Sequence, residues 1–303
     1  MSWHAIVVGV DSSPESAAAA AMAERLARLA TAECHLVHAV RDEWAPLAAV
    51  KGADAGDLAE MQRLQAAVAR HRIQEALRDH VSPRLLESLQ LRVGPAPVVL
   101  QQAAAEYDAG LIVVGGKHHT TLERWLGGST NLNVVRAAER PVLVTTHPGD
   151  FRRILVAADL SAAARPTLAL AQRFARLVGA TLRVLSVFEP LPILAGVPPV
   201  EASGYFTLSQ ELLERDIWPL IRSANVERVV RHGSVVETLP REAADWGADL
   251  IVLGSHGKGW AQRILLGSVT ERLINDLPVS LLIAPVEARV VAPRRRVAAA
   301  AAV

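Results

Sequence analysis

The chain has 303 residues, of which 51% are hydrophobic and 21% are charged, and its formal net charge is +1. This composition excludes disordered and collagen-like chains, and the near-zero net charge argues against a nucleic-acid-binding protein, which usually carries a basic excess. A length of about two ordinary ~150-residue domains favours a two-domain organisation.

The first half of the chain alternates short apolar runs with longer segments of helical periodicity, and it begins with a strand. Strands are predicted at residues 5–10, 35–40, 89–93, 111–114 and 142–145, and helices at 17–31, 58–77, 98–107 and 131–138. Residues 46–57 are rich in Pro, Gly and Ala and are predicted to form a loop.

The second half follows the same order. Strands are predicted at residues 154–158, 182–188, 226–231, 250–253 and 280–284, helices at 167–179, 208–222, 237–246 and 269–275, and a loop at 190–204. At an offset of 148 residues, 6–13 falls on 154–161, so that Asp11 aligns with Asp159. At an offset of 139, residues 94–144 align without a gap with 233–283, and 14 of these 51 pairs are identical. The chain is therefore predicted to contain one kind of domain twice.

Strands that read as continuous Val/Ile/Leu runs and alternate with helices indicate a parallel sheet covered on both faces. Each half is predicted to be an α/β domain with a doubly wound, Rossmann-like or flavodoxin-like sheet of five parallel strands. The predicted domains span 1–149 and 150–290, followed by a disordered tail at 291–303. Ligands of such sheets bind beyond the carboxyl ends of the strands, where the strand order reverses, so the residues after the first and fourth strands are the candidates.

A glycine-rich motif follows the fourth strand of the second half. Gly254, Ser255, His256 and Gly257 are followed by nine residues and then by Gly267, Ser268, Val269 and Thr270. Glycines let a phosphate approach backbone N–H groups closely, because no side chain stands between them. The second pair of residues, Gly267 and Ser268, opens the last helix, whose free N–H groups and dipole favour an anion.

Together with an aspartate after the first strand, this motif resembles the ATP-binding branch of the universal stress proteins. The resemblance covers nearly the whole chain, once per half, as in tandem members of that family. It implies ATP, with Mg²⁺ as a potential companion, as a ligand. The residues that it assigns to cofactor binding in the second half are Asp159, Val187, Gly254, Ser255, His256, Gly257, Gly267, Ser268, Val269 and Thr270. In this assignment Asp159 lies against the adenosine, Val187 meets the adenine edge, and the glycines with Ser268 hold ribose and phosphates.

Structural roles are open for several of these residues. Asp159 with Ser161 fits a turn that caps the first helix of the half, and Ser268 with Glu271 fits a capping box. Gly254 and Gly257 fit simple turn glycines, and His256 fits a loop residue that lines the pocket, because the sequence gives it no carboxylate partner.

The first half departs from the motif. Asp11, Gly115, Gly128 and Ser129 match, but His118 stands where the second half has Gly257. An imidazole at this position obstructs close backbone approach, so nucleotide binding is expected mainly in the second half. Lys117 could contact a phosphate, and His118 with His119 could bind a metal ion. No Cys, Asp or Glu lies at a spacing typical of a zinc site, however, so no metal site is predicted.

The leading functional hypothesis is a stress-response protein that binds ATP as a regulatory ligand, and no catalytic residue is assigned. The alternatives are a nucleotide-free interaction or assembly module, and a slow ATPase or autophosphorylating protein. No segment approaches the ~18 apolar residues of a membrane span, no signal sequence is evident, and the single cysteine, Cys34, fits a reducing compartment. A cytoplasmic protein without membrane or nucleic-acid partners is expected. Pairing of 142–145 with 280–284 within one chain would make it a pseudo-dimer, and a homodimer is a further expectation.

Overall fold

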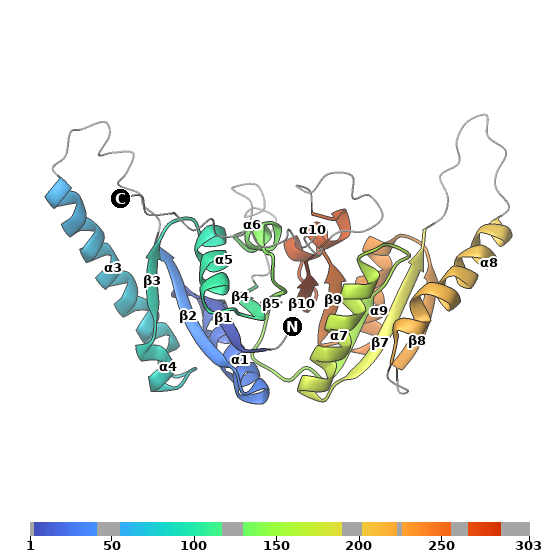
Figure 1. The fold of residues 1–303 in the computed structure, drawn as a ribbon, viewed down its shortest axis with the longest axis horizontal. Coiled ribbons are helices and arrows are strands. Elements are labelled where there is room, and N and C mark those ends of the chain that lie inside the picture. Colours follow the sequence, from blue (N-terminus) through green and yellow to red (C-terminus); the bar gives the residue numbers. More distant parts are fainter. Residues whose placement is uncertain are drawn as a thin grey trace, which may run out of the picture.

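The computed structural model describes residues 3–40, 55–116, 130–189, 202–222, 226–255 and 266–285. Ten strands form one continuous sheet with the order β3-β2-β1-β4-β5-β10-β9-β6-β7-β8 (Figure 1). None of the described helices combines the length and apolar character that crossing a membrane requires.

The first half contributes the strands β1 (Ala5–Gly9), β2 (Glu33–Val40), β3 (Gln90–Val93), β4 (Leu111–Gly115) and β5 (Val142–Thr145). Its helices are α1 (Pro14–Ala30), α3 (Ala55–Leu77), α4 (Pro83–Glu87), α5 (Ala96–Glu106) and α6 (Thr130–Ala137). The ends of α1 illustrate how sequence sets these bounds, because the Ser13 hydroxyl accepts the Ser16 N–H, Pro14 opens the helix, and Thr31 ends it in the left-handed conformation.

The second half contributes β6 (Arg153–Ala157), β7 (Thr181–Phe188), β8 (Val226–His232), β9 (Leu250–Gly254) and β10 (Ser280–Ala284). Its helices are α7 (Ala164–Val178), α8 (Ala202–Leu212), the π-helix η2 (Leu213–Ile217), the 3₁₀-helix η3 (Trp218–Leu220), α9 (Val235–Trp246) and α10 (Ser268–Asn275). Gly179 ends α7 with φ of 70°, a conformation that glycine adopts without strain.

Both halves have the predicted α/β architecture. Within each half all strand pairs are parallel, and the first strand lies between the second and the fourth. The predicted strands and most helices are present with shifted ends. The prediction missed α4, and it was wrong in making 208–222 one α-helix, because the helix widens into η2 and tightens into η3 at Trp218 and Pro219. Proline lacks the N–H that an α-helix interior needs.

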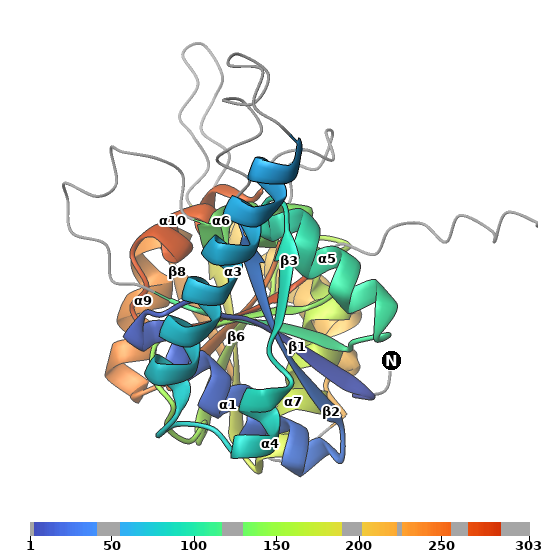
Figure 2. The same cartoon turned by 90° about the vertical axis from the view of Figure 1, so that its left-hand side faces the viewer.

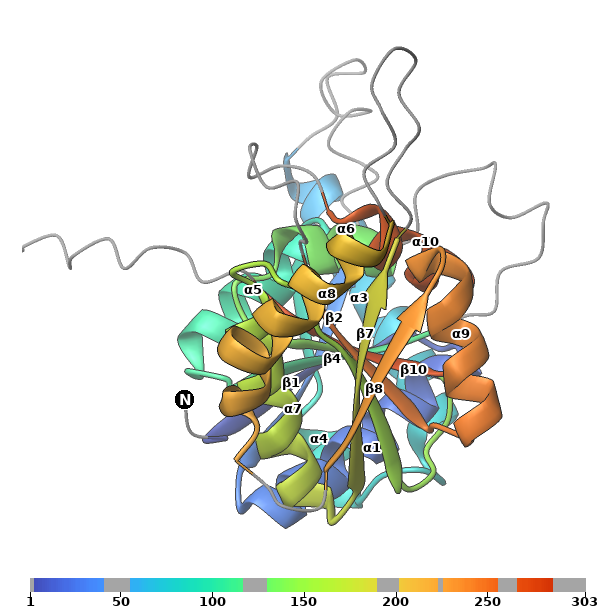
Figure 3. The same ribbon diagram turned by 90° about the vertical axis from the view of Figure 1, so that its right-hand side faces the viewer.

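Helices cover the sheet on both faces. On one face α1, α3 and α4 of the first half lie with α7 and α8 of the second, over a core that includes Ile6, Leu26, Ile154 and Phe174 (Figures 1 and 2). On the other face α5, α6, α9 and α10 pack over a second core, and Figure 3 shows α9 across β7 and β8 from α7 and α8. The buried Val/Ile/Leu runs of the strands supply both layers, since successive side chains point to opposite faces.

The two halves join through their last strands. β5 and β10 pair in antiparallel orientation, with Leu143 opposite Leu282, and both side chains are fully buried. The hydroxyl of Ser280, also buried, accepts the Thr146 N–H at 3.1 Å and lies 3.4 Å from the hydroxyl of Thr145. The repeat therefore builds one sheet rather than two separate ones.

Candidate functional site

The strand order of the second half reverses between β6 and β9. From β6 the chain proceeds outward to β7 and β8, and it then returns to place β9 on the other side of β6. The two strands run parallel with Val156 opposite Val252, so their carboxyl ends lie together at one edge. Asp159 follows β6 at this edge, and Gly254 ends β9. This is the place where doubly wound sheets bind ligands.

Three hydrogen bonds to backbone carbonyl groups connect the end of β9 with β10 and with the start of α10. The Ser255 N–H donates to the Ala284 carbonyl at 2.8 Å, and the Ser255 carbonyl accepts the Gly267 N–H at 2.9 Å. The Thr270 hydroxyl donates to the Gly254 carbonyl at 3.0 Å. Ser255 and Thr270 are buried, whereas Ser268 is exposed. The end of β9 and the start of α10 are thus held against each other, as the two parts of the motif require.

Among the described residues, no side chain caps the amino end of α10. Gly267 is its N-cap residue, with φ of −59° and ψ of 138°, and Ser268 is already the first helical residue. The capping box between Ser268 and Glu271 does not form, since Glu271 instead pairs with Arg136 of α6 at 3.1 Å. The first-turn N–H groups therefore remain suited to an external anion.

Only one of the two carboxylate oxygens of Asp159 takes part in the turn that follows β6. Its Oδ1 accepts the Ser161 N–H at 3.1 Å and the Ser161 hydroxyl at 2.5 Å. Its Oδ2 has no hydrogen-bond partner among the described residues, and Asp159 is half-buried. The turn role that the sequence left open is therefore present, but it uses only one of the two oxygens.

The equivalent aspartate of the first half is bound more tightly into its turn. Asp11 Oδ1 accepts the Ser13 N–H at 2.8 Å, the Ser13 hydroxyl and the Ser16 hydroxyl at 2.8 Å, and the Asp11 N–H donates to Ser16 Oγ at 2.9 Å. The position of Ser16 is taken by Ala164 in the second half. The second-half aspartate therefore has fewer intramolecular donors.

Gly115 has a packing reason to be glycine. A Cβ atom there would lie 2.5 Å from the backbone carbon and oxygen of Glu15, at the start of α1. The Gly115 carbonyl accepts the Asn131 side-chain N–H at 2.8 Å, as the Gly254 carbonyl accepts the Thr270 hydroxyl. Asn131 was not among the predicted residues, although the 139-residue offset aligns it with Thr270 and would have identified it.

The remaining predicted residues are placed as follows. Val187 is half-buried near the carboxyl end of β7, and Val269 is half-buried in the first turn of α10. His256 and Gly257 of the second half, and Lys117, His118, His119, Gly128 and Ser129 of the first, lie outside the described residues. Among the residues that are described, no group of three or more His, Cys, Asp or Glu side chains is arranged to hold a metal ion.

Comparisons with known proteins agree along nearly the whole chain. The profile of the Universal stress protein family matches residues 2–146 and 150–285. A universal stress protein of Mycolicibacterium smegmatis is 29% identical over 295 residues, which cover 92% of this chain and 96% of that protein. A universal stress protein of Mycobacterium tuberculosis is 29% identical over 291 residues, covering 88% and 91%.

A solved structure of a universal stress protein shows the same fold. A universal stress protein from Archaeoglobus fulgidus superposes with a TM-score of 0.63 at 17% identity, covering 94% of this chain and 99% of its own. A second solved protein, a universal stress protein in complex with cAMP, aligns with 45% of this chain and 97% of its own at 21% identity and a TM-score of 0.33.

Proposed function

Because this chain belongs to the universal stress protein family, with one family domain in each half, we propose that it binds ATP as a regulatory ligand in its second half. The observation that carries this proposal is that Asp159, which follows β6, and the start of α10, which is bonded to the end of β9, lie at the same edge of the sheet, where the strand order reverses. A hydrogen-bond acceptor then lies at one end of the site and anion-binding N–H groups at the other.

Each chemical part of ATP has a matching group in this proposal. The Oδ2 atom of Asp159, which no described residue contacts by a hydrogen bond, accepts hydrogen bonds from hydroxyl or amino groups of the adenosine. The backbone of Val187 meets the adenine edge. The N–H groups at the start of α10, next to Gly267 and Ser268, receive the phosphates, each such helix-end interaction contributing about 0.3–1 kcal/mol. The family resemblance adds His256 and Gly257, which lie outside the described residues, to the proposed site, with Mg²⁺ carried on the phosphates.

In this proposal ATP acts through binding and not through hydrolysis, as a regulatory ligand in a cytoplasmic stress response. Thr270 and Ser255, two polar residues of the motif, are buried and bonded to the ends of β9 and β10, so they fix the loop base. A slow hydrolysis of ATP would show as sustained phosphate release, and binding without release supports the regulatory role. The single cysteine of the sequence supports the cytoplasmic location.

Equilibrium dialysis with radiolabelled ATP tests the site. We expect saturable binding by the wild type and a loss of about tenfold in affinity, or ~1.4 kcal/mol, for Asp159→Ala. Asp11→Ala is the matched control in the first half, and it should leave the affinity unchanged. Ser161→Ala removes only the turn contact, so an equal loss in this variant would show that Asp159 acts through the turn and not on the ligand. No binding by the wild type at millimolar ATP would refute the proposal.

A further inference from the structure

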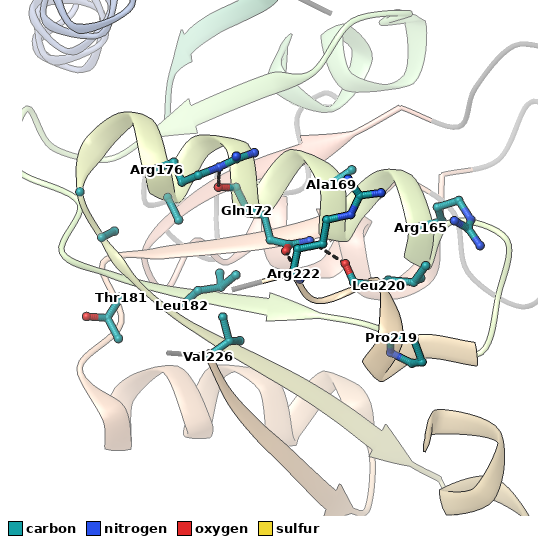
Figure 4. Close-up of a pocket in the computed structure, with 13 residues that line it drawn as sticks. Arg165, Ala169, Gln172, Arg176, Thr181, Leu182, Pro219, Leu220, Arg222 and Val226 are labelled. Atoms are coloured by element: carbon teal, nitrogen blue, oxygen red, sulfur yellow. Dashed lines mark hydrogen bonds between the residues drawn. The ribbon is translucent and has the colours of Figure 1, made fainter. Parts of the chain in front are cut away.

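A cavity of about 970 Å³ lies in the second half, away from the motif after β9. Its walls are one face of α7, η3 with the segment that follows it, and the first residues of β7 and β8 (Figure 4). Aliphatic side chains form part of the lining, among them Leu182, Pro219 and Val226. Three arginines, Arg165, Arg176 and Arg222, also line it.

The arginines are spread along the cavity. Arg165, Ala169, Gln172 and Arg176 are spaced by four, three and four residues, so they share one face of α7 (Figure 4). With a rise of 1.5 Å per residue, the Cα atoms of Arg165 and Arg176 are about 16 Å apart along the helix. Arg222 enters from the opposite wall beside Gln172.

Gln172 holds that opposite wall in place. Its Oε1 accepts the Arg222 N–H at 2.7 Å, and its Nε2 donates to the Leu220 carbonyl at 3.1 Å. Arg176 donates from Nε to the backbone carbonyl of Gln172 at 3.3 Å, which leaves its terminal nitrogens unused by that bond. Within the part of the chain that the structure describes, no carboxylate forms an ion pair with Arg165, Arg176 or Arg222.

The first half provides an internal comparison. β1 pairs with β2, and β6 with β7, in registers related by 148 residues, so Gln172 stands at the position of Glu24 and Arg176 at that of Arg28. In the first half Glu24 pairs with Arg28 at 3.4 Å, and its carboxylate oxygens accept the Ser82 N–H at 3.3 Å. Replacing Glu24 by a glutamine keeps the backbone contact but removes the negative charge that neutralises the arginine.

Two other differences make this face of the second half more exposed and more positively charged. Ala17, which is buried in α1, is replaced by the exposed Arg165. The helix α4 lies between α3 and β3 in the first half, whereas in the second half η3 ends at Leu220 and β8 already begins at Val226. Between η3 and β8 of the second half the structure describes only Ile221 and Arg222, so no described counterpart of α4 lies on this face, where the positive charge has increased.

We propose that this arginine-lined groove binds an extended acidic peptide segment of a partner protein. Five residues in extended conformation span about 16 Å at ~3.3 Å per residue, which matches the distance between the outer arginines. Glutamate or aspartate side chains pair with the guanidinium groups, and aliphatic side chains contact Leu182, Pro219 and Val226. A compact phosphate would reach only part of this length.

Fluorescence anisotropy with a fluorescein-labelled Glu-Glu-Leu-Glu-Leu-Glu peptide tests the groove on the full chain. We expect saturable binding that weakens with added NaCl, and at least a tenfold loss of affinity in the double variant Arg165→Ala/Arg176→Ala. Both side chains are exposed, so the thermal midpoint of this variant should equal that of the wild type. Arg28→Ala, the counterpart of Arg176→Ala in the first half, should bind the peptide as the wild type does.

Four results would overturn the proposal. These are a lack of saturation by the wild type, an equal loss of affinity in Arg28→Ala, equally strong binding of a peptide with Gln in place of Glu, and displacement of the labelled peptide by inorganic tripolyphosphate at lower concentrations than by unlabelled peptide. The last result would assign the groove to a phosphate ligand.

Discussion

A Cβ atom at Gly115 would lie 2.5 Å from backbone atoms of Glu15 and 2.9 Å from the Ser16 nitrogen. These neighbours belong to the backbone of α1 and cannot rotate away as a side chain can. Gly115 matches the glycine of the nucleotide motif in sequence, yet its absence of a side chain also allows the helix to approach β4. A matching residue type is thus no measure of function by itself.

We predict that Gly115→Ala lowers the free energy of unfolding by about 1–3 kcal/mol, because the added methyl group forces the strand and helix apart. Urea denaturation followed by circular dichroism measures the change. Gly204→Ala is the control, since a Cβ atom there meets open space within α8 and alanine favours a helix. Equal stability of Gly115→Ala and the wild type would contradict the packing role.

Cys34 is predicted to be unreactive in the folded protein. Burial, together with the nearby Glu24 carboxylate, raises the pKa of its thiol from 9.0 to about 12. At pH 8 the thiolate fraction of the native protein is then roughly a thousandfold lower than that of an unfolded chain. The thiolate is the species that reacts, so the reaction rate falls with this fraction. Labelling with an iodoacetamide reagent should be correspondingly slow, and it should accelerate as the pH rises toward 11. Labelling of the native protein at the rate seen in urea would contradict the prediction.

At the scale of elements, each half fastens the end of its fourth strand to its last helix. Thr270 performs this role in the second half and Asn131 in the first, both by donating to a strand-end glycine carbonyl. The chemistry differs, a hydroxyl against an amide, but the position is the same. This connection fixes the start of α10, on which the proposed phosphate contacts depend.

Thr270→Val and Asn131→Leu form a matched pair. Each removes one donor to a glycine carbonyl, and we expect each to lower the free energy of unfolding by about 1–3 kcal/mol. Only Thr270→Val should weaken ATP binding, because only α10 lies in the proposed site. Urea denaturation and equilibrium dialysis measure the two effects. Equal weakening of ATP binding by both variants would point to a general loss of structure.

The sequence predicted the regular elements well for a physical reason. Buried parallel strands are continuous apolar runs, and their alternation with helices is visible without knowledge of contacts. The helix α4 was missed because five residues show no periodicity, although Ser82 and Pro83 carry a start signal that the structure uses. The π-helix η2 buries Leu213 and Ile217 against the core, a contact that the sequence pattern did not show.

The candidate site was predicted only in part. The motif located Asp159, Gly267 and Ser268 at the reversal of strand order, because the position of a loop after a strand follows from topology. The sequence did not reveal which hydrogen bonds Asp159 and Asp11 make, since these depend on the exchange of Ser16 for Ala164. The sequence also gave no sign of the arginine-lined groove, because its residues come from α7, η3 and two strands and lie together only in the folded chain.

At the scale of the whole molecule, the junction of β5 and β10 makes the two halves one structural unit. α1 contacts α7 on one face and α6 contacts α10 on the other, and Arg136 pairs with Glu271 across the second of these contacts. Both hydrophobic cores therefore extend across the junction. A homodimer remains a prediction that light scattering tests.

We predict that the protein unfolds in one cooperative transition and that Leu143→Ala lowers the midpoint of the entire transition. Leu143 is fully buried opposite Leu282, and loss of such a side chain costs about 2–5 kcal/mol. Differential scanning calorimetry distinguishes one transition from two. Two separate transitions, of which Leu143→Ala shifts only the first-half one, would contradict the coupling.

The central proposal is that ATP binds mainly in the second half, so that one ATP per chain is expected. Native mass spectrometry of the full chain with excess ATP tests this most directly, because it counts the ligands on each molecule. The account predicts a single ATP adduct, lost in Asp159→Ala and retained in Asp11→Ala. An absence of any adduct, or two ATP molecules per chain, would contradict it.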